Sequence, residues 1–392
     1  MNDPVSVLVV GAGPVGLSAA LALTQAGVAV RVVDAASDID RRMRASTFHP
    51  PTLDMIATLG LSKSLTKQGL PVPRFQMRQH ESGEHVTFDL TEISDATDHP
   101  FRLQVEQHHY CELAIEALAK LGVDVKFDTA VESIAQDDDI VTASLHNGKT
   151  SAKWLIGADG SGSAVRKSLG LDYGGRTYTH SSVLASTPFP FHQHLEDISD
   201  VSYCWSGRGP FSLLRLRNFW RVSLYPGVED LTEAASRDRV YDWLTHIHPA
   251  ARDAELLNVS PYRVHERCVD RFRMGRVFLA GDAAHLNPPS GGLGMNGGIH
   301  DAMNLSRKLL QVLNGAEDKL LDQYDRQRRN LACKRIIPQA AANRARMSTT
   351  GRFQQLDSLK QHRIIASDKQ ALREFLLQTS MISGLREAEA IE

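Results

Sequence analysis

Three glycines near the N-terminus have a spacing that suits phosphate binding. Gly11, Gly13 and Gly16 follow the apolar residues 5–10 in the string GAGPVG, which matches G-x-G-x-x-G. In such a turn the first glycine permits the bend, the second lets a pyrophosphate approach, and the third lets the next helix pack on the strand. Asp34 closes the next apolar run, 18 residues after Gly16, where a carboxylate can accept both ribose hydroxyls. The pattern predicts a dinucleotide site, without separating NAD from FAD.

Two later strings place acidic side chains at the ends of apolar strands. Residues 155–166 read LIGADGSGSAVR, and residues 277–296 read VFLAGDAAHLNPPSGGLGMN. An acid at the carboxyl end of a strand, such as Asp159 or Asp282, can bond sugar hydroxyls. Glycines in the second string let a loop wrap a flat ligand, and the helix expected from Met295 points its N–H dipoles at negative charge there. Both strings therefore predict ligand contacts.

Arginines and tyrosines on the later strands are candidate substrate contacts. Alternation along the expected strands places Arg221 and Tyr225 on one face of their strand, while Arg215 and Tyr203 lie on neighbouring strands. We take Tyr203, Arg215 and Tyr225 as the catalytic or pocket candidates. An arginine aimed inward would suit a carboxylated substrate. The alternative for each residue is a solvated strand arginine or a packed tyrosine.

Histidines and cysteines point to no metal site. The paired histidines at 192 and 194, and at 246 and 248, have no third ligand nearby. His285 lies in the GDAAH string, where we expect it to pack beside the loop. The four cysteines have no CxxC spacing, which argues against a disulfide scaffold and a structural zinc site and makes a reducing cytoplasm the default location. They are Cys111, Cys204, Cys268 and Cys333.

The elements that must position these residues follow an α/β pattern. Residues 5–10, 17–25 and 28–33 predict a strand, a helix and a second strand, which make a βαβ unit. Longer alternating strands between 180 and 265 predict a separate antiparallel sheet. Residues 277–281 then return to a buried, parallel-type strand, and long helices follow to the C-terminus.

Composition excludes several classes of protein. The chain has 392 residues, of which 42% are hydrophobic and 23% charged, as in globular rather than disordered proteins. Its 44 basic and 46 acidic residues leave a net charge of -2, so we expect no nucleic-acid partner. The uncharged run 4–30 is interrupted by glycines and has no basic segment before it, which argues against a membrane span or signal peptide. The basic cluster Arg326–Arg329 is predicted to be the solvated face of a helix.

Taken in order and spacing, the strings GxGxxG, GADGxxSxVR and GDAAHxxPPxGGxGMNxG resemble those of the group A flavoprotein aromatic hydroxylases, the para-hydroxybenzoate hydroxylase type. The resemblance covers roughly residues 1–345. It implies one FAD, NADH or NADPH as a co-substrate without a Rossmann domain of its own, and O2. The implied reaction is hydroxylation of a small activated aromatic or heteroaromatic compound, phenol-like and with or without a carboxylate, through a flavin C4a-hydroperoxide.

The resemblance also assigns residues to FAD. Asp34 would bind the adenosine ribose, Asp282 the ribitol, and Arg44 of the RMRA segment the pyrophosphate. Pro289 and the glycine loop after it would lie against the isoalloxazine, and Gln107 would touch the flavin side chain. Position 293 is Leu where the family often has Gln or Lys, which puts that polar contact in doubt. The full implied set is Gly11, Gly13, Pro14, Val15, Gly16, Asp34, Ala35, Arg42, Arg44, Gln107, Val131, Asp159, Gly160, Asp282, Pro289, Gly292, Gly294, Met295 and Asn296.

The predicted fold class is therefore α/β: a Rossmann-type FAD-binding domain with a parallel sheet, interleaved with an antiparallel-sheet substrate domain and followed by C-terminal helices. Those helices would either cover the substrate domain or form a contact between subunits. A homodimer is therefore one of the predicted possibilities. The predicted boundaries are 1–72, 101–178 and 269–344 for the FAD domain, 73–100 and 179–268 for the substrate domain, and 345–392 for the helical segment.

Other classes of flavoprotein are weaker alternatives. Flavin halogenases carry a W-x-W-x-I-P segment that this chain lacks, and disulfide reductases need a close cysteine pair soon after the first Rossmann unit. An ordinary NAD dehydrogenase would leave the third string unexplained. Another FAD-dependent oxidoreductase, or a catalytically silent flavin-binding protein of the same fold, remains an alternative. The silent protein would bind FAD without any substrate-stimulated consumption of NAD(P)H.

Overall fold

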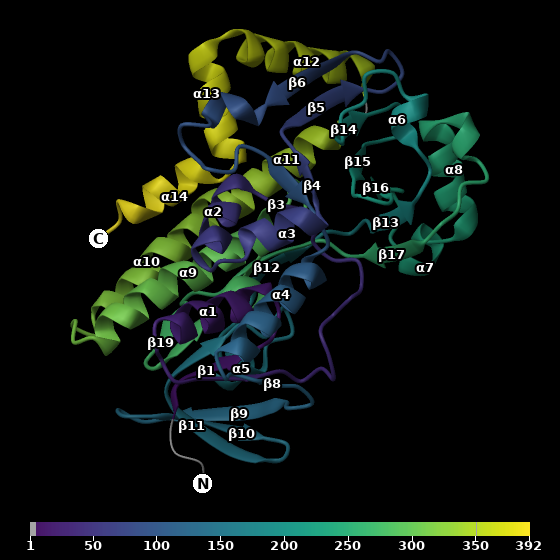
Figure 1. Ribbon diagram of the computed structural model, residues 1–392. Helices are drawn as coiled ribbons and strands as arrows, with labels where there is room; N and C mark the ends of the chain where they lie inside the picture. The colour runs from purple at the N-terminus through teal and green to yellow at the C-terminus, as the bar shows by residue number, and fades with distance from the viewer. Residues whose placement is uncertain (1–4, 350) are drawn as a thin grey trace.

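The structure is a computed structural model that describes residues 5–349 and 351–392 (Figure 1). It has the predicted α/β organisation, with one large mixed sheet, a second large sheet of mainly antiparallel strands, and helices at the C-terminal end. Pro4, where the uncharged run begins, lies outside the described residues. Within the described residues, no helix combines the length and the apolar character needed to cross a membrane.

The N-terminal apolar run forms the centre of an eight-stranded sheet. Strand β1 buries its last four residues completely or almost so, as its valine-rich sequence favours, and pairs in parallel with β2 and β11. Strand β20 extends the parallel part beyond β11. The carboxyl ends of parallel strands share one edge of a sheet. The loops that the three sequence strings form after β1, β11 and β20 therefore all lie at the same edge of this sheet. The strands are β1 (Val5–Val10), β2 (Val30–Val33), β8 (Val125–Lys126), β9 (Val131–Gln136), β10 (Val141–Leu145), β11 (Gly148–Gly157), β19 (Arg273–Met274) and β20 (Val277–Leu279).

Strand β11 serves two parts of the sheet. Its first residues form an antiparallel meander with β9 and β10, and the strand continues without a break into the apolar residues 155–157. On one side the first half of β11 pairs with β10 and its last three residues pair with β20, while β1 lies along the other side. The neighbour of β11 on this edge changes from β10 to β20. This change explains why the sequence of β11 is partly polar in its first half and apolar at its end.

Helix α1 begins at Pro14, three residues before the predicted start. Proline fits this position because the first turn of a helix needs no donor from its N–H and the ring presets φ. Helix α1 contacts α4 and α9, and α9 runs beside α10 in Figure 1. The helices around the large sheet are α1 (Pro14–Gln25), α2 (Pro50–Thr58), α3 (Ser62–Gln68), α4 (Gln107–Lys120), α5 (Ala164–Ser168), α9 (Leu293–Leu313), α10 (Leu320–Leu331) and α11 (Ile337–Met347).

The second sheet has seven strands in the order β17-β13-β16-β15-β14-β5-β6, and only the β14–β5 pair among them is parallel. One face packs Leu213, Val222 and Leu224 into a core with helix α8. Alternation turns Arg221 and Ser223 to the other face. The elements are β5 (Arg74–Gln79), β6 (His85–Asp89), β13 (Ser182–Thr187), β14 (Val201–Trp205), β15 (Phe211–Arg215), β16 (Trp220–Leu224), β17 (Asn258–Tyr262), α6 (Phe191–His194), α7 (Leu231–Ala234) and α8 (Arg237–Ile247).

Two small sheets and the C-terminal helices complete the fold. Helix α12 packs on β5 and β6, and its Leu359 joins Leu376 of α13 in a core with Phe75 and Phe88. The C-terminal segment therefore covers the second sheet, one of the two arrangements that the sequence left open. The elements are β3 (Thr47–Phe48), β4 (Leu70–Val72), β7 (Arg102–Gln104), β12 (Gly174–Thr177), β18 (His265–Cys268), β21 (His285–Leu286), α12 (Arg352–Ser367), α13 (Lys369–Thr379) and α14 (Ile382–Glu389).

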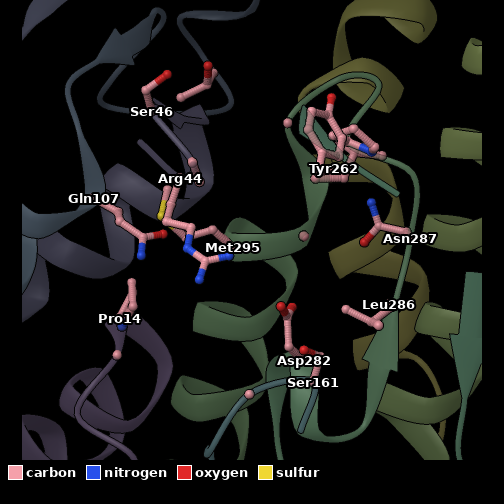
Figure 2. A pocket seen from close by; sticks show the side chains of 18 of the residues that line it. Pro14, Arg44, Ser46, Gln107, Ser161, Tyr262, Asp282, Leu286, Asn287 and Met295 are labelled. Carbon is pink, nitrogen blue, oxygen red and sulfur yellow. The ribbon is translucent and has the colours of Figure 1, made fainter. Parts of the chain in front are cut away.

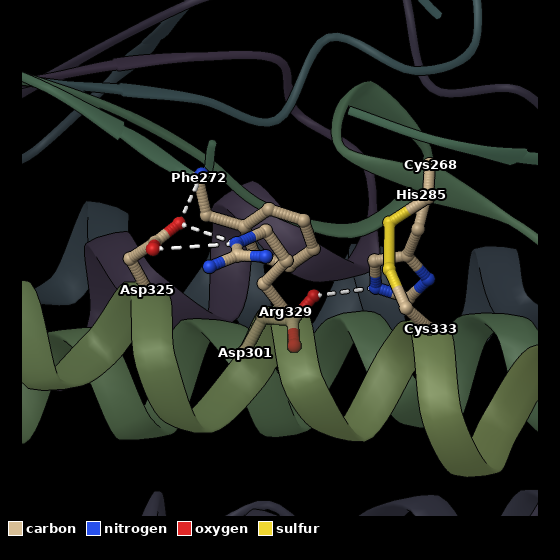
Figure 3. Close-up of a disulfide and its surroundings, with 7 residues drawn as sticks. All are labelled: Cys268, Phe272, His285, Asp301, Asp325, Arg329 and Cys333. Carbon is tan, nitrogen blue, oxygen red and sulfur yellow. Dashed lines mark hydrogen bonds and ion pairs between the residues drawn. A yellow bond between two sulfur atoms is a disulfide. The ribbon is translucent and has the colours of Figure 1, made fainter. Parts of the chain in front are cut away.

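One disulfide corrects the prediction from cysteine spacing. Cys268 of β18 and Cys333 are bonded, with their Cα atoms 6.7 Å apart (Figure 3). Cys333 lies in a π-helical turn, Ala332–Ile336, which joins α10 to α11. The two cysteines are 65 residues apart in sequence, so no local spacing pattern could pair them. Cys111 and Cys204 are free and buried.

Candidate functional site

A cavity of about 1320 Å³ lies between the two large sheets. Its volume exceeds that of a typical single-ligand pocket, about 300–1,000 Å³. The glycine turn after β1 and the loops after β2, β11 and β20 line one end, which we call the dinucleotide end. The face of the second sheet that carries Tyr203, Arg221 and Tyr225 lines the other, which we call the substrate end. Figure 2 shows Asp282 pointing into this space, with Arg44 on one side and Asn287 on the other.

The glycine turn forms a cradle of the kind a pyrophosphate needs. Gly11 has φ +109°, and a Cβ there would lie 2.3 Å from the carbonyl oxygen of Ala158. A Cβ on Gly16 would lie 1.9 Å from the Gly11 carbonyl oxygen, so Gly16 allows α1 to pack against the turn. A Cβ on Gly13 would meet no atom within 4 Å and would project into the cavity. The space at Gly13, next to the free N–H groups of α1, fits the phosphates of a dinucleotide.

Asp34 and Asp282 present carboxylates to the cavity from different strands. Asp34 accepts hydrogen bonds from the N–H groups of Ala12, at 2.6 Å, and Ala36, at 2.8 Å. Asp282 is open to the cavity, and the surrounding protein raises the pKa of its carboxyl group. No side chain among the described residues bonds the Asp282 carboxylate, which leaves it available to a ligand hydroxyl. This pair of acids fits the two sugar-like parts of FAD.

Asp159 also lines the dinucleotide end of the cavity, but its carboxylate is already hydrogen-bonded to the start of helix α5. Its carboxylate accepts hydrogen bonds from Ser163 Oγ at 2.6 Å and from the N–H of Ala164 at 2.7 Å, and so caps α5. Burial raises the pKa of this carboxyl group. Gly160, the next residue, has φ +74° and lines the cavity with open space at its Cα. The GADG string thus contributes backbone to the cavity wall, and its acid fixes the loop.

Most residues that the resemblance assigned to FAD line the cavity. They are Gly11, Gly13, Pro14, Val15, Asp34, Ala35, Arg42, Arg44, Gln107, Val131, Asp159, Gly160, Asp282, Pro289, Gly292, Gly294 and Met295. Gly16 and Asn296 do not line it. Asn296 is buried, accepts a hydrogen bond from the His49 N–H at 2.9 Å and donates one to the Thr47 carbonyl at 2.9 Å, so it holds the glycine loop against β3.

A buried ion-pair network lies behind the glycine loop. Asp301 of α9 accepts hydrogen bonds from Arg328 Nε at 2.6 Å and from the Gly281 N–H at 3.0 Å. His285 Nε2 lies 2.8 Å from Asp301 Oδ2, and its ring stacks on Phe272 (Figure 3). His285 therefore packs beside the loop, as predicted. The prediction that Arg326–Arg329 is a solvated face is wrong for Arg328, which is 1% exposed.

The structure brings Tyr203 and Tyr225 to the substrate end but not Arg215. Arg215 points to the same side of β15 as the core residue Leu213, away from the cavity, where its Nη1 lies 3.1 Å from Asp200 Oδ1. Arg221 of β16 lines the cavity instead. Alternation places Arg221 on the same face as Tyr225, a signal that could have favoured Arg221 over the predicted Arg215.

Sequence reasoning missed the contribution of the C-terminal helices. His362, Phe375 and Thr379 line the cavity beside residues of β5 and β14. The Phe375 ring lies 4.6 Å from that of Phe88, and His362 stands edge-on to both rings. Burial lowers the pKa of His362. His362 and Phe375 form an aromatic wall that lines the substrate end.

Comparison with known proteins agrees with this geometry. A family model described as "FAD binding domain" matches residues 4–337. The chain is 34% identical to a para-nitrophenol 4-monooxygenase of Pseudomonas sp. (strain WBC-3), over 98% of this chain and 97% of that protein. It is 32% identical to a 6-hydroxy-3-succinoylpyridine 3-monooxygenase of Pseudomonas putida (strain DSM 28022 / S16), over 86% of this chain and 87% of the relative.

A solved structure covers nearly the same length. The crystal structure of p-nitrophenol 4-monooxygenase from Pseudomonas putida DLL-E4 superposes with a TM-score of 0.89 at 34% identity, over 96% of this chain and 98% of that one. The chain therefore belongs to the family of FAD-dependent aromatic hydroxylases.

Proposed function

We propose that the protein is a single-component monooxygenase that uses NADH or NADPH and O2 to hydroxylate a small activated aromatic or heteroaromatic compound. The observation that carries this proposal is the single cavity that joins the Gly13 and Asp282 end to the sheet face with Tyr203, Arg221 and Tyr225. When bound and reduced, FAD supplies the activated oxygen atom, and the protein supplies orientation and electrostatics.

Residues of this chain have distinct tasks in that reaction. The Gly13 turn would take the pyrophosphate, and Asp34 and Asp282 the two sugar-like parts of FAD. Backbone N–H groups at the start of α9 would face the ring, because Gly292 and Gly294 line the cavity there. The tyrosines of the second sheet would orient the substrate, and the aromatic wall would keep the reacting atoms dry.

The named relatives favour a phenol or a hydroxypyridine as substrate. One relative is a monooxygenase of para-nitrophenol and another of a hydroxylated succinoylpyridine. For this chain we propose a substrate of the same class, a single activated ring with an ionisable hydroxyl group. We propose the domain boundaries given above on the same basis, and a homodimer stays a prediction.

Substrate-stimulated oxidation of NAD(P)H tests the proposal. The purified protein, loaded with FAD, is assayed with NADH and with NADPH against a panel of phenols and hydroxypyridines. We expect at least one aromatic compound to accelerate oxidation of one nucleotide by about tenfold or more, because substrate binding completes the site. Full FAD occupancy with no acceleration by any compound would favour the alternative, a catalytically silent flavin-binding protein.

A further inference from the structure

His49 is a buried histidine that contacts the glycine loop before α9. It follows β3, is the N-cap residue of α2, and has no exposed surface. Its Nε2 lies 2.8 Å from the Gly291 carbonyl oxygen, and its backbone N–H donates to Asn296 Oδ1 at 2.9 Å. Gly291 lines the cavity and His49 does not. The histidine therefore supports the cavity wall from behind.

The bond to Gly291 fixes which ring nitrogen of His49 carries the proton. A carbonyl oxygen only accepts hydrogen bonds, so Nε2 must donate. Burial and the nearby charge of Arg102 lower the pKa of His49 to about 3, so the ring is neutral and has this one N–H. Nδ1 is then an unprotonated acceptor, buried and without a partner among the described residues. The only donor of the ring is thus used on the loop.

The loop that His49 holds contains two glycines in unusual backbone conformations. Gly291 and Gly292 have φ +98° and +68°, and glycine adopts positive and negative φ about equally well. The peptide between them could therefore rotate and turn the Gly291 carbonyl into the cavity. His49 opposes this rotation at the carbonyl. At the other end of the same peptide, the Gly292 N–H donates to the Pro289 carbonyl at 2.9 Å.

The residues after the two glycines present N–H groups to the same part of the cavity. Leu293, Gly294 and Met295 form the first turn of α9 and line the cavity. The first N–H groups of a helix have no acceptor within it, and none of these three donates to a described residue. Negative charge in front of them is stabilised, whereas a carbonyl oxygen turned into this space would repel it. The orientation of the Gly291 carbonyl therefore affects how well this part of the cavity accepts negative charge.

We propose, building on the proposed function, that His49 is a positioning residue for FAD, which holds the Gly291 carbonyl away from the flavin ring. Reduction adds negative charge to the ring, so N–H donors in front of it favour the reduced form over the oxidised form. Without the His49 donor the Gly291 carbonyl would be buried and unpaired, and the glycine loop could turn it towards the ring. Bound FAD would then be harder to reduce.

The reduction potential of bound FAD tests this without NAD(P)H or any aromatic compound. FAD-loaded protein is titrated anaerobically with dithionite beside a reference dye, and absorbance reports how much of each is reduced. In His49→Leu the donor is gone, and we expect reduced FAD to bind about tenfold more weakly relative to oxidised FAD. For a two-electron couple this tenfold change lowers the potential by about 30 mV. His49→Asn should have the same effect, because its shorter amide does not reach the Gly291 carbonyl, and it replaces the leucine variant if that variant does not fold.

Rescue and a matched control separate this role from packing. His49→Gln places an amide N–H near the position of Nε2, so the relative binding of reduced FAD should stay within about threefold of wild type. His300→Leu is the control, because His300 is also a buried histidine, and its Nε2 bonds Thr52 Oγ1 at 2.8 Å instead of the loop. It should leave the potential unchanged.

The difference in potential between wild type and His49→Leu should stay constant between about pH 6 and about pH 9. Arg102 and, from α9, His300 are the charged and titratable groups that act on His49. Burial also lowers the pKa of His300, so both imidazoles remain neutral throughout this range. A charged imidazole would instead lose its effect as pH rises.

Several results would overturn the proposal. They are an unchanged potential in His49→Leu and His49→Asn, an equal fall in His300→Leu, no recovery in His49→Gln, and a difference that disappears at high pH. Loss of FAD, with an unchanged potential in the protein that retains it, would show that His49 serves packing alone. Failure of the proposed function looks different: the potentials would shift as expected while no aromatic compound accelerates NAD(P)H oxidation.

Discussion

The charged residues beside Arg328 in the sequence lead to the wrong prediction of its exposure to solvent. It stands in a basic cluster, and charge runs on helices usually face water. Its position relative to Leu321, Tyr324 and Leu331 places it on the buried face of α10, at spacings of seven, four and three residues. Helical periodicity therefore predicts that Arg328 is buried, whereas the basic composition of the cluster predicts that it is exposed. The partner Asp301 lies on another helix, so no local pattern could pair them.

Replacing Asp301 by Asn should destabilise the protein strongly. The variant leaves Arg328 buried without a counter-ion, and breaking such a pair typically costs about 3–5 kcal/mol of unfolding free energy. Unfolding in urea at pH 7, with FAD absent, measures the change. Asp322→Asn is the control on α10, because its carboxylate is 56% exposed and pairs with Arg273 at the surface; it should cost about 1 kcal/mol or less.

The same substitution should flatten the acid side of the stability profile. Arg328 and His285 hold the pKa of the Asp301 carboxyl at about 2, below its ordinary value, although burial alone would raise it. Because the folded-state pKa is depressed, this carboxylate contributes stability above about pH 4, which is lost as pH falls towards 2. Wild type should therefore lose more unfolding free energy than Asp301→Asn between pH 5 and pH 3. Parallel curves for the two proteins would contradict the assignment.

At the scale of elements, the β1–turn–α1 unit was predictable because each of its parts has a local cause. Valines favour the buried strand, glycines permit the turn, and proline starts the helix. Strands β14 to β16 were predictable as alternating segments between residues 180 and 265, because alternation is also a local signal. Alternation also grouped Arg221 with Tyr225, but it could not say which face meets the cavity. That choice depends on where the core under α8 forms, a tertiary fact that no single strand contains.

The glycine turn offers a prediction that separates folding from cofactor binding. Gly13→Ala should fold normally, since Gly13 has φ −79° and ψ 179° and an added Cβ meets no atom. Its methyl group would occupy the space assigned to the pyrophosphate, so FAD affinity should fall at least about tenfold. Gly16→Ala should instead destabilise the apoprotein by about 1–3 kcal/mol, because its Cβ collides with backbone. Unfolding of apoprotein and titration with FAD measure the two effects. Unchanged FAD affinity in Gly13→Ala would refute the cradle.

The disulfide predicts a redox dependence of stability. The bond closes a long loop between β18 and the turn after α10, and such bonds typically contribute about 2–4 kcal/mol. Reductant should lower the Tm of wild type, while Cys333→Ser should start from the lower Tm and not respond. Denatured, unreduced protein should show two reactive thiols, from Cys111 and Cys204. Four thiols would show that the bond is absent, as the predicted reducing cytoplasm would favour.

At the scale of the whole molecule, the cavity exists because three distant parts of the chain meet. Sequence strings predicted the dinucleotide end well, since parallel strands bring their carboxyl ends to one edge. The aromatic wall at the substrate end, which belongs to α12 and α13, was not predictable. These helices carry no motif, and their apolar residues indicate only that each helix covers some surface of the protein. Phe375 and His362 line the substrate end only because their helices, α13 and α12, pack on the second sheet.

Phe375 should therefore limit the size of the substrate. Phe375→Leu removes ring volume from the cavity wall, and a pocket change of this size shifts substrate preference by about 10-fold or more in kcat/KM. The ratio of kcat/KM for 2-phenylphenol to that for 4-nitrophenol should rise accordingly. Phe353→Leu on α12 is the control, because Phe353 is 82% exposed. An unchanged ratio in Phe375→Leu would place the substrate elsewhere.

The central claim is that one cavity holds FAD and an aromatic substrate so that an oxygen atom of O2 reaches the ring. The most direct measurement is turnover under ¹⁸O2 with FAD-loaded protein, NADH or NADPH, and the aromatic compound that best stimulates oxidation. Mass spectrometry of the products then reports the origin of the new hydroxyl group. We predict a hydroxylated aromatic product that carries one ¹⁸O atom, formed in proportion to the nucleotide consumed. Nucleotide consumption without any labelled aromatic product would contradict the account.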